Sequence, residues 1–134
     1  MKKNELIVVR AEAKYISEQS DPPTQKFIWS YEITIDNQSP TMVQLLNRYW
    51  RIIDMTGKME EVQGAGVIGL QPVVKPNKSF IYTSFCQLTM PQGTMEGYYE
   101  MQNVDDEEHF VVEIPKFVLS APSVLINPFR AKLH

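Results

Sequence analysis

The sequence has little of the two residue types that most often build covalent or metal-held sites: one cysteine, Cys86, and two histidines, His109 and His134. A single thiol cannot form an intramolecular disulfide, which excludes the class of small secreted domains that disulfides stabilise. It also indicates a reducing compartment. So few thiol and imidazole groups also exclude a structural zinc site. Cytoplasmic localisation is therefore expected.

Long hydrophobic runs are missing as well. The opening segment MKKNELIVVRAEAK contains an apolar run of four residues, which is too short for a signal-peptide core, and no stretch approaches the length of a membrane span. The net charge of −3, with 22% charged residues, gives none of the basic excess that nucleic-acid binding requires. Neither membrane insertion nor a nucleic-acid partner is expected. With 43% hydrophobic residues, the 134-residue chain can build a single core.

Alternation of apolar and polar residues is the clearest pattern that is present. In KFIWSYEITID, the side chains of Phe27, Trp29, Tyr31, Ile33 and Ile35 share one parity. Period-2 spacing is typical of a half-buried strand, whereas a helix would scatter these residues around its circumference.

Similar patterns continue along the chain and are separated by turn signals. A proline, Pro115, interrupts the run EHFVVEIPKFVLS and predicts an edge or bulged strand. In MVQLLNRYWRIID the apolar parity changes, which a β-bulge near Leu45 and Leu46 would explain, unless the strand is covered on both faces. Asp54 and Gly57 predict a hairpin turn. Seven or eight short strands without a helical period favour an all-β antiparallel sandwich.

A glycine-rich string, GAGVIG, places Gly64, Gly66 and Gly69 in the spacing of a phosphate-binding loop. The dinucleotide-binding form of this motif needs a helix directly after the glycines, but Gln71 and Pro72 follow instead. The favoured interpretation is that the glycines allow sharp bends or close backbone contacts. The other interpretation is an anion site built from consecutive backbone N–H groups.

Other candidates for chemistry are weak, and no catalytic residue, metal ligand or cofactor is predicted. The acidic run 105–108 is expected to be a solvated hairpin tip, although it could hold a hard cation. Glu60 and Glu61 fall on opposite faces of a strand and cannot chelate together. His109 could pair in space with Cys86, but the constellation for nucleophilic catalysis is otherwise missing.

Two adjacent aromatic pairs, Tyr49–Trp50 and Tyr98–Tyr99, offer a candidate interaction surface. In a regular strand one ring of each pair must point inward and the other outward, and outward aromatic rings are enriched at interfaces. Burial of both rings is the alternative, and a symmetric apolar face would make a homodimer. The predicted interaction surface consists of Arg48, Tyr49, Arg51, Tyr98 and Tyr99.

Read together and in order, the segments LLNRYWRI, EVQGAGVIGLQP, YTSF, GTMEGYYEM and IPKFVLSAPSVLIN resemble the bacterial ApaG (CorD) family and the ApaG domain of certain eukaryotic proteins. The resemblance covers Leu6 to Ile126. It implies one fibronectin type III-like sandwich over residues 1–126. Residues 127–134 follow a proline-rich stretch and are expected to form a flexible tail. It also implies pyrophosphate or nucleotide binding by Gly64, Gly66 and Gly69, an indirect association with cobalt and magnesium resistance or efflux, and protein interaction.

The function predicted from the sequence is therefore a non-catalytic binding module for a protein partner or a phosphate-bearing ligand. The alternative is a divalent-cation-dependent phosphoanhydride hydrolase, in which carboxylates such as Glu60, Asp105 or Glu108 hold the metal. Carboxylates gathered at the glycine loop would favour the hydrolase, and apolar or aromatic groups there would favour the binding module.

Overall fold

The computed structural model describes residues 3–122 and places eight strands in them. The domain boundary expected at residue 126 and the flexible tail expected at 127–134 lie outside these residues. Two short 3-10 helices, η1 (Lys3–Glu5) and η2 (Pro22–Thr24), accompany the strands. The strands are β1 (Ile7–Tyr15), β2 (Phe27–Asn37), β3 (Val43–Asp54), β4 (Met59–Ala65), β5 (Val73–Val74), β6 (Ser79–Leu88), β7 (Gln92–Asn103) and β8 (His109–Ser120).

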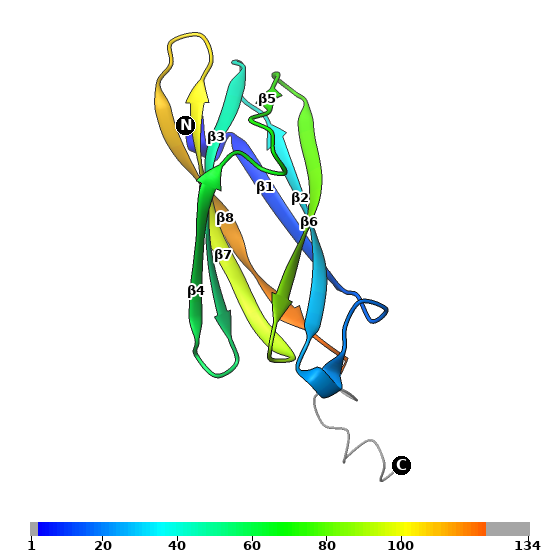
Figure 1. Ribbon diagram of the computed structural model, residues 1–134. Helices are drawn as coiled ribbons and strands as arrows, with labels where there is room; N and C mark the ends of the chain where they lie inside the picture. Colours follow the sequence, from blue (N-terminus) through cyan, green and yellow to red (C-terminus); the bar gives the residue numbers. More distant parts are fainter. Residues whose placement is uncertain (1–2, 123–134) are drawn as a thin grey trace.

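The strands form two antiparallel sheets that pack face to face (Figure 1). One sheet has the order β1-β2-β6, and the other has the order β4-β3-β7-β8, with β5 added to the end of β3. Apolar side chains from both inner faces form one continuous core. The structure thus confirms the predicted all-β sandwich of the fibronectin type III and immunoglobulin-like class.

The central strand β2 shows how the sequence produces this layering. The alternating residues Phe27, Trp29, Tyr31, Ile33 and Ile35 are all buried, and the last two are fully inaccessible. Polar residues between them point to the outer face, as the pattern predicted.

A β-bulge in β3 explains the change of parity that the sequence showed. The register with β7 shifts between Leu45 and Asn47, so that Leu46 is the extra residue. Val43 and Leu45 before the bulge and Trp50 after it are all buried. The bulge therefore brings both apolar sets to the inner face, as expected.

The prediction for Pro115 is also confirmed. β8 is the edge strand of its sheet, and its register with β7 shifts between Met95 and Gly97, opposite Ile114 and Phe117. Pro115 lies inside this irregularity, where its missing N–H group does not interrupt a ladder.

The predicted hairpin turn joins β3 to β4. The Asp54 carboxylate accepts hydrogen bonds from the backbone N–H of Thr56 at 2.8 Å and from its hydroxyl at 2.6 Å. These bonds hold the pKa of Asp54 below its ordinary value, chiefly through the Thr56 hydroxyl. The left-handed φ of 88° at Gly57 closes the turn.

The two sides of the sandwich differ. β1 and β8 run close together and join the sheets at one side. On the other side, the edge strands β4 and β6 flank a cavity of about 260 Å³ that opens between the sheets. Among residues 3–122, no helix has the length and apolar character needed to cross a membrane.

Candidate functional site

The glycine-rich loop begins where β4 ends and contains a tight turn at its tip, residues 67–70. Val67 and Leu70 exchange two backbone hydrogen bonds of 2.8 and 2.9 Å. The two residues between them, Ile68 and Gly69, have φ values of 45° and 78°. Two positive φ values inside a two-residue hairpin loop define a type I′ turn, which normally selects Asn and Gly. Gly69 suits its position, and Ile68 does not.

Gly66 is required for a different reason, namely close approach of the backbone. A Cβ atom at Gly66 would overlap the carbonyl oxygen of Leu70, and its φ of 65° is itself a left-handed value. The Gly66 N–H donates to the carbonyl oxygen of Leu46 in the β3 bulge at 2.8 Å. The bulge therefore anchors the start of the loop, and the predicted structural role of this glycine is supported by its geometry.

The Arg48 guanidinium forms hydrogen bonds with the base of the glycine-rich loop. Its Nη1 atom donates to the carbonyl oxygens of Ala65 at 3.1 Å and Gly66 at 3.0 Å. The guanidinium also covers Gly64, where a Cβ atom would lie 2.9 Å from Nη1. Arg48 is half-buried: it shares the face of β3 that carries Trp50 and lines the cavity of the open side, and it also lines a depression beside Tyr49 and Tyr98. The predicted place of Arg48 in the interaction surface stays a prediction.

These contacts use most of the hydrogen-bonding groups that a phosphate would need. The N–H groups of Gly66, Val67 and Leu70 all donate to backbone carbonyls. Within the described part of the chain, the amides of Ile68 and Gly69 are the loop-tip N–H groups without a backbone acceptor. The side chains that the loop shows to solvent are apolar: Ile68 is 55% exposed and Leu70 is 52% exposed. Neither residue carries a signal in the sequence pattern, which draws on the glycines alone.

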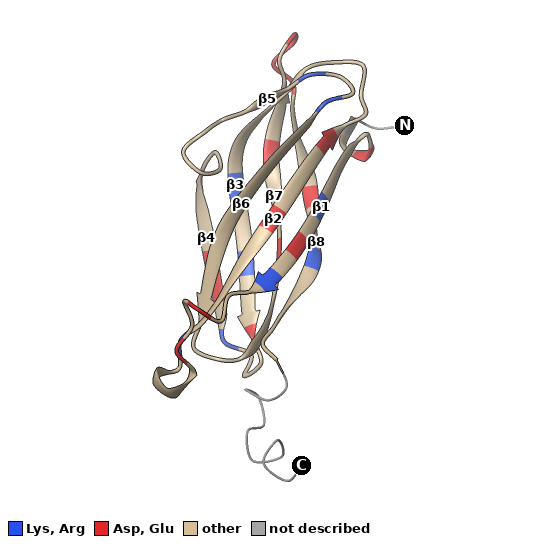
Figure 2. Cartoon of the chain, turned by 90° about the vertical axis from the view of Figure 1, so that its right-hand side faces the viewer, with Lys and Arg blue, Asp and Glu red and all other residues tan. Residues whose placement is uncertain are grey.

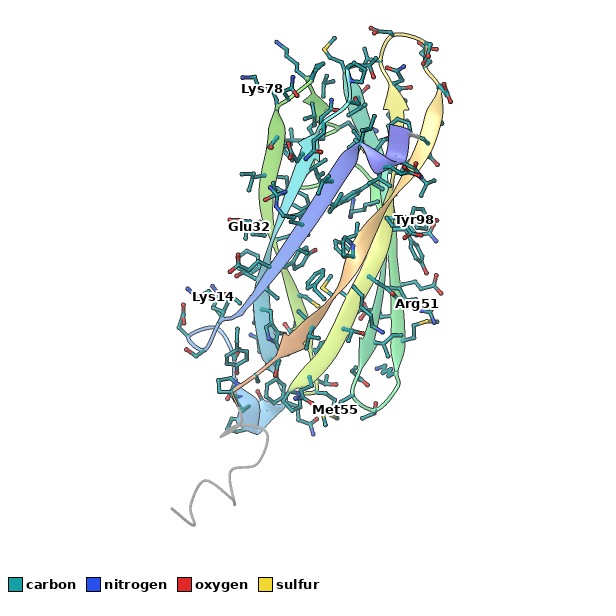
Figure 3. The ribbon with its side chains drawn as sticks, turned by 180° about the vertical axis from the view of Figure 1, so that it is seen from behind. Lys14, Glu32, Arg51, Met55, Lys78 and Tyr98 are labelled. Carbon is teal, nitrogen blue, oxygen red and sulfur yellow. The ribbon has the colours of Figure 1, made fainter. Side chains whose placement is uncertain are left out.

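Two tyrosine side chains, called here the tyrosine stack, lie on the outer face of the sheet that contains β3 and β7. The rings of Tyr49 and Tyr98 are stacked, with centroids 4.9 Å apart. The Tyr49 hydroxyl donates to the Glu61 carboxylate at 3.0 Å, and this bond raises the pKa of Tyr49. Arg51 projects from the same side of the molecule as Tyr98 (Figure 3).

The other ring of each aromatic pair points inward, as period-2 geometry requires. Trp50 and Tyr99 are 2% and 0% exposed. The hydroxyls of Tyr82 and Tyr99 share a buried hydrogen bond of 2.5 Å. Burial raises the pKa values of both phenols. Tyr99 therefore has to be removed from the predicted interaction surface, because a fully buried ring cannot contact a partner.

A shallow depression of about 380 Å³ joins the tyrosine stack to the start of the glycine loop. Its walls include Tyr49 and Tyr98 on one side and Gly64 on the other. Glu100 is the carboxylate that lines it, and Asn47 donates to this carboxylate at 3.1 Å. The predicted interaction surface and the glycine-rich loop are thus neighbours, and the depression between them is lined by aromatic and amide side chains together with the charged groups of Arg48 and Glu100.

The hydrolase constellation does not assemble. Cys86 is on β6 and His109 begins β8 in the other sheet, where its Nδ1 lies 3.8 Å from Glu100 Oε1. Burial raises the pKa of the Cys86 thiol to about 11, so that the thiol is protonated at neutral pH.

The candidate carboxylates are also dispersed. The run 105–108 forms the β7–β8 hairpin tip, where the Asp106 side chain accepts from the Glu108 backbone N–H at 3.0 Å. Glu61 binds Tyr49 on the outer face, whereas Glu60 lines the cavity between the sheets. In residues 3–122, no three His, Cys, Asp or Glu side chains gather as a metal site would require.

The fold and the loop geometry together define a small β-sandwich domain with an outward-facing glycine loop. The ApaG domain model matches residues 17–103. The chain belongs to the ApaG family. It is 48% identical to Protein ApaG of Allorhizobium ampelinum over 118 residues, covering 88% of this chain and 90% of that protein. It is 47% identical to Protein ApaG of Mesorhizobium japonicum over 116 residues, covering 87% and 88%.

Solved structures agree with this assignment. A crystal structure described as an ApaA protein from Bordetella pertussis is 37% identical, with a TM-score of 0.83, and the match covers 87% of this chain and 94% of that chain. A structural-genomics X-ray structure is 40% identical, with a TM-score of 0.85 and 92% of both chains covered. At 9% identity and a TM-score of 0.51, a protein from Archaeoglobus fulgidus shares the fold alone.

Proposed function

We propose that this ApaG-family chain is a non-catalytic binding module that contacts a partner protein through the tip of its glycine loop, residues 67–70. The observation that carries the proposal is Ile68. A β-branched residue with a φ of 45° costs backbone energy that Asn or Gly at the same position would avoid. Its side chain is nevertheless 55% exposed, so burial in the core does not offset that cost. Residues held in such conformations cluster at binding sites.

The surroundings support a rigid contact surface. Arg48 and the β3 bulge fix the base of the loop, which limits the ordering cost of binding. The tyrosine stack also borders Arg51, because a second depression is lined by Tyr49, Tyr98 and Arg51, and tyrosine and arginine are enriched in binding hot spots. These features favour a protein partner over the metal-dependent hydrolase.

Pyrophosphate or nucleotide binding at Gly64, Gly66 and Gly69 is the second candidate function. The free amides of Ile68 and Gly69 favour it, because adjacent N–H groups can converge on an anion. A role in cobalt and magnesium resistance would then be indirect, through the bound partner or ligand. Cytoplasmic localisation remains the expectation from the single cysteine.

The test compares affinity capture from native extract by the wild type, by a variant with Ile68→Ser and Leu70→Ser, and by a Val118→Ser control. Val118 is 64% exposed on β8, away from the loop, so the control removes a similar apolar side chain. We expect a specific set of captured proteins to disappear with the loop variant and to persist with the control. Equal capture by all three proteins would contradict the proposal.

The phosphate candidate is tested separately by calorimetric titration with pyrophosphate and magnesium. We expect binding no tighter than about 100 μM, because the two loop-tip amides supply few hydrogen bonds and no dedicated lysine assists them. Sub-micromolar affinity would establish the anion site and reject this expectation.

A further inference from the structure

The four edge strands of the sandwich are not equally protected against pairing with another chain. β1 carries Arg10 and Lys14 among its exposed residues, and β4 carries Glu60 and Glu61. β8 contains Pro115 within its bulge. Charges, proline and bulges are the usual devices that prevent edge-to-edge association. β6, with the sequence SFIYTSFCQL, has no charged residue and no proline, and its register with β2 is uninterrupted.

β6 also presents apolar side chains to solvent in a regular row. Ile81 is 58% exposed and Phe85 is 59% exposed on the outer face, with Thr83 between them. Within residues 3–122, β6 has β2 as its one ladder partner, so its other edge carries unpaired backbone groups. Figure 2 shows β6 free of the blue and red that mark charged residues on β1 and β2.

We propose that the occupant of this edge is a second copy of the same chain, paired β6 to β6 in antiparallel orientation about Thr83. The two three-stranded sheets then become one six-stranded sheet across a two-fold axis. In that register Ile81 lies opposite Phe85 of the second copy, and the two Thr83 side chains face each other. The β6 edge does not include the loop tip, and its occupant is a second copy of the chain, so the inference is independent of the proposed function.

The sequence of β6 favours a second copy over an unrelated strand because the segment is complementary to itself. Aromatic residues opposite β-branched residues, and threonine opposite threonine, are favourable cross-strand pairs. No like charges meet across the axis, because β6 has none. A two-fold contact is also closed: it covers the unprotected edge on both copies, and the six-stranded sheet then ends at the two β1 strands, which carry charged residues.

The predicted dimer is weak and reversible. One pair of strands buries less surface than a standard stable interface, so we expect a dissociation constant of about 1–100 μM. Sedimentation equilibrium of the full chain, from about 5 μM to about 1 mM, should show a reversible monomer–dimer equilibrium.

Thr83→Lys is the diagnostic variant. Thr83 is exposed and lies opposite Glu32 on β2, so a lysine gains an acidic neighbour within its own chain. In the dimer, however, two lysines would face each other at the axis, and we expect the dissociation constant to rise at least about tenfold. Val118→Lys, a similar change at the exposed edge of β8, should leave the dissociation constant unchanged.

A charge-swap experiment separates this contact from any other. An equal mixture of Thr83→Lys and Thr83→Glu proteins should form heterodimers more tightly than either variant forms homodimers, because the axis then pairs opposite charges. Recovery of dimer in the mixture also shows that both variants are folded. A wild-type chain that stays monomeric to about 1 mM, or a dimer that Thr83→Lys does not weaken, would overturn the inference.

Discussion

The guanidinium of Arg48 holds the glycine loop by its carbonyl oxygens, with Nη1 3.0 Å from the carbonyl oxygen of Gly66. Arg48 thus donates to the carbonyl oxygens of Ala65 and Gly66, while backbone carbonyls accept hydrogen bonds from most of the N–H groups of the loop. A loop whose own groups are paired in this way keeps its shape without a ligand. The apolar tip of the loop is then presented on a rigid base.

Replacing Arg48 by methionine should destabilise the protein by about 1–3 kcal/mol, because two carbonyl oxygens of the loop lose a charged donor while the apolar stem is kept. Urea unfolding at neutral pH measures the change. Arg51→Met is the matched control, since Arg51 is exposed on the opposite face of the same strand, and its effect should stay within about 0.5 kcal/mol. Equal losses for the two variants would show that the Arg48 contacts do not stabilise the loop.

Gly66→Ala should destabilise the protein by more than about 2 kcal/mol, because the new Cβ combines a left-handed φ with overlap on the Leu70 carbonyl. Gly57→Ala provides the comparison. Gly57 also has a positive φ, of 88°, but open space surrounds its missing Cβ. Its substitution should cost about 1 kcal/mol through the backbone alone. Thermal unfolding of both variants measures the difference, and similar losses would argue against the steric requirement at Gly66.

Much of the sandwich could be predicted from the sequence because its pattern is local. The buried row of β2, the parity change of β3 and the proline of β8 each report which face of a strand is apolar. The same rule explains why one ring of each aromatic pair, Tyr49–Trp50 and Tyr98–Tyr99, points into the core. The partial burial of Arg48 agrees with the same rule, since Arg48 shares the parity of Trp50.

The loop tip and the unprotected edge depend on information that local pattern does not carry. The GAGVIG string is recognised by its glycines. The type I′ turn that gives Ile68 its positive φ depends instead on the two backbone hydrogen bonds between Val67 and Leu70. That β6 lies at an edge follows from strand order, which is set by long-range pairing. Neither feature has a signal in a window of a few residues.

Ile68→Asn should stabilise the protein by about 1 kcal/mol, because asparagine tolerates the left-handed conformation that isoleucine adopts at a cost. Ile68→Ala is the control at the same position: it removes the exposed side chain but keeps an unfavourable Cβ, so it should gain less. Chemical unfolding of the three proteins gives the order. If alanine stabilises as much as asparagine, relief of backbone strain is not the cause. Under the proposed function, both variants should also capture less partner than the wild type.

The thiol of Cys86 should make folding stability fall with pH in the alkaline range. Burial of this 8%-exposed side chain raises its pKa to about 11, above the ordinary value of 9.0 that applies in the unfolded chain. The unfolded state therefore loses its proton first. The stabilising contribution is complete below about pH 9 and disappears as pH rises through about 11.

Cys86→Ala isolates this contribution from other groups that titrate at high pH. The pKa values of Tyr31, Tyr82 and Tyr99 are also raised by burial, so alkaline pH should weaken both proteins through their phenols. The difference in unfolding free energy between wild type and variant cancels those phenols. That difference should be constant from about pH 6 to 8 and then shift by about 1–2 kcal/mol in favour of the variant by about pH 11. A difference that does not change with pH would mean that the folded thiol ionises as readily as the unfolded one, and that β6 opens its inner face to water.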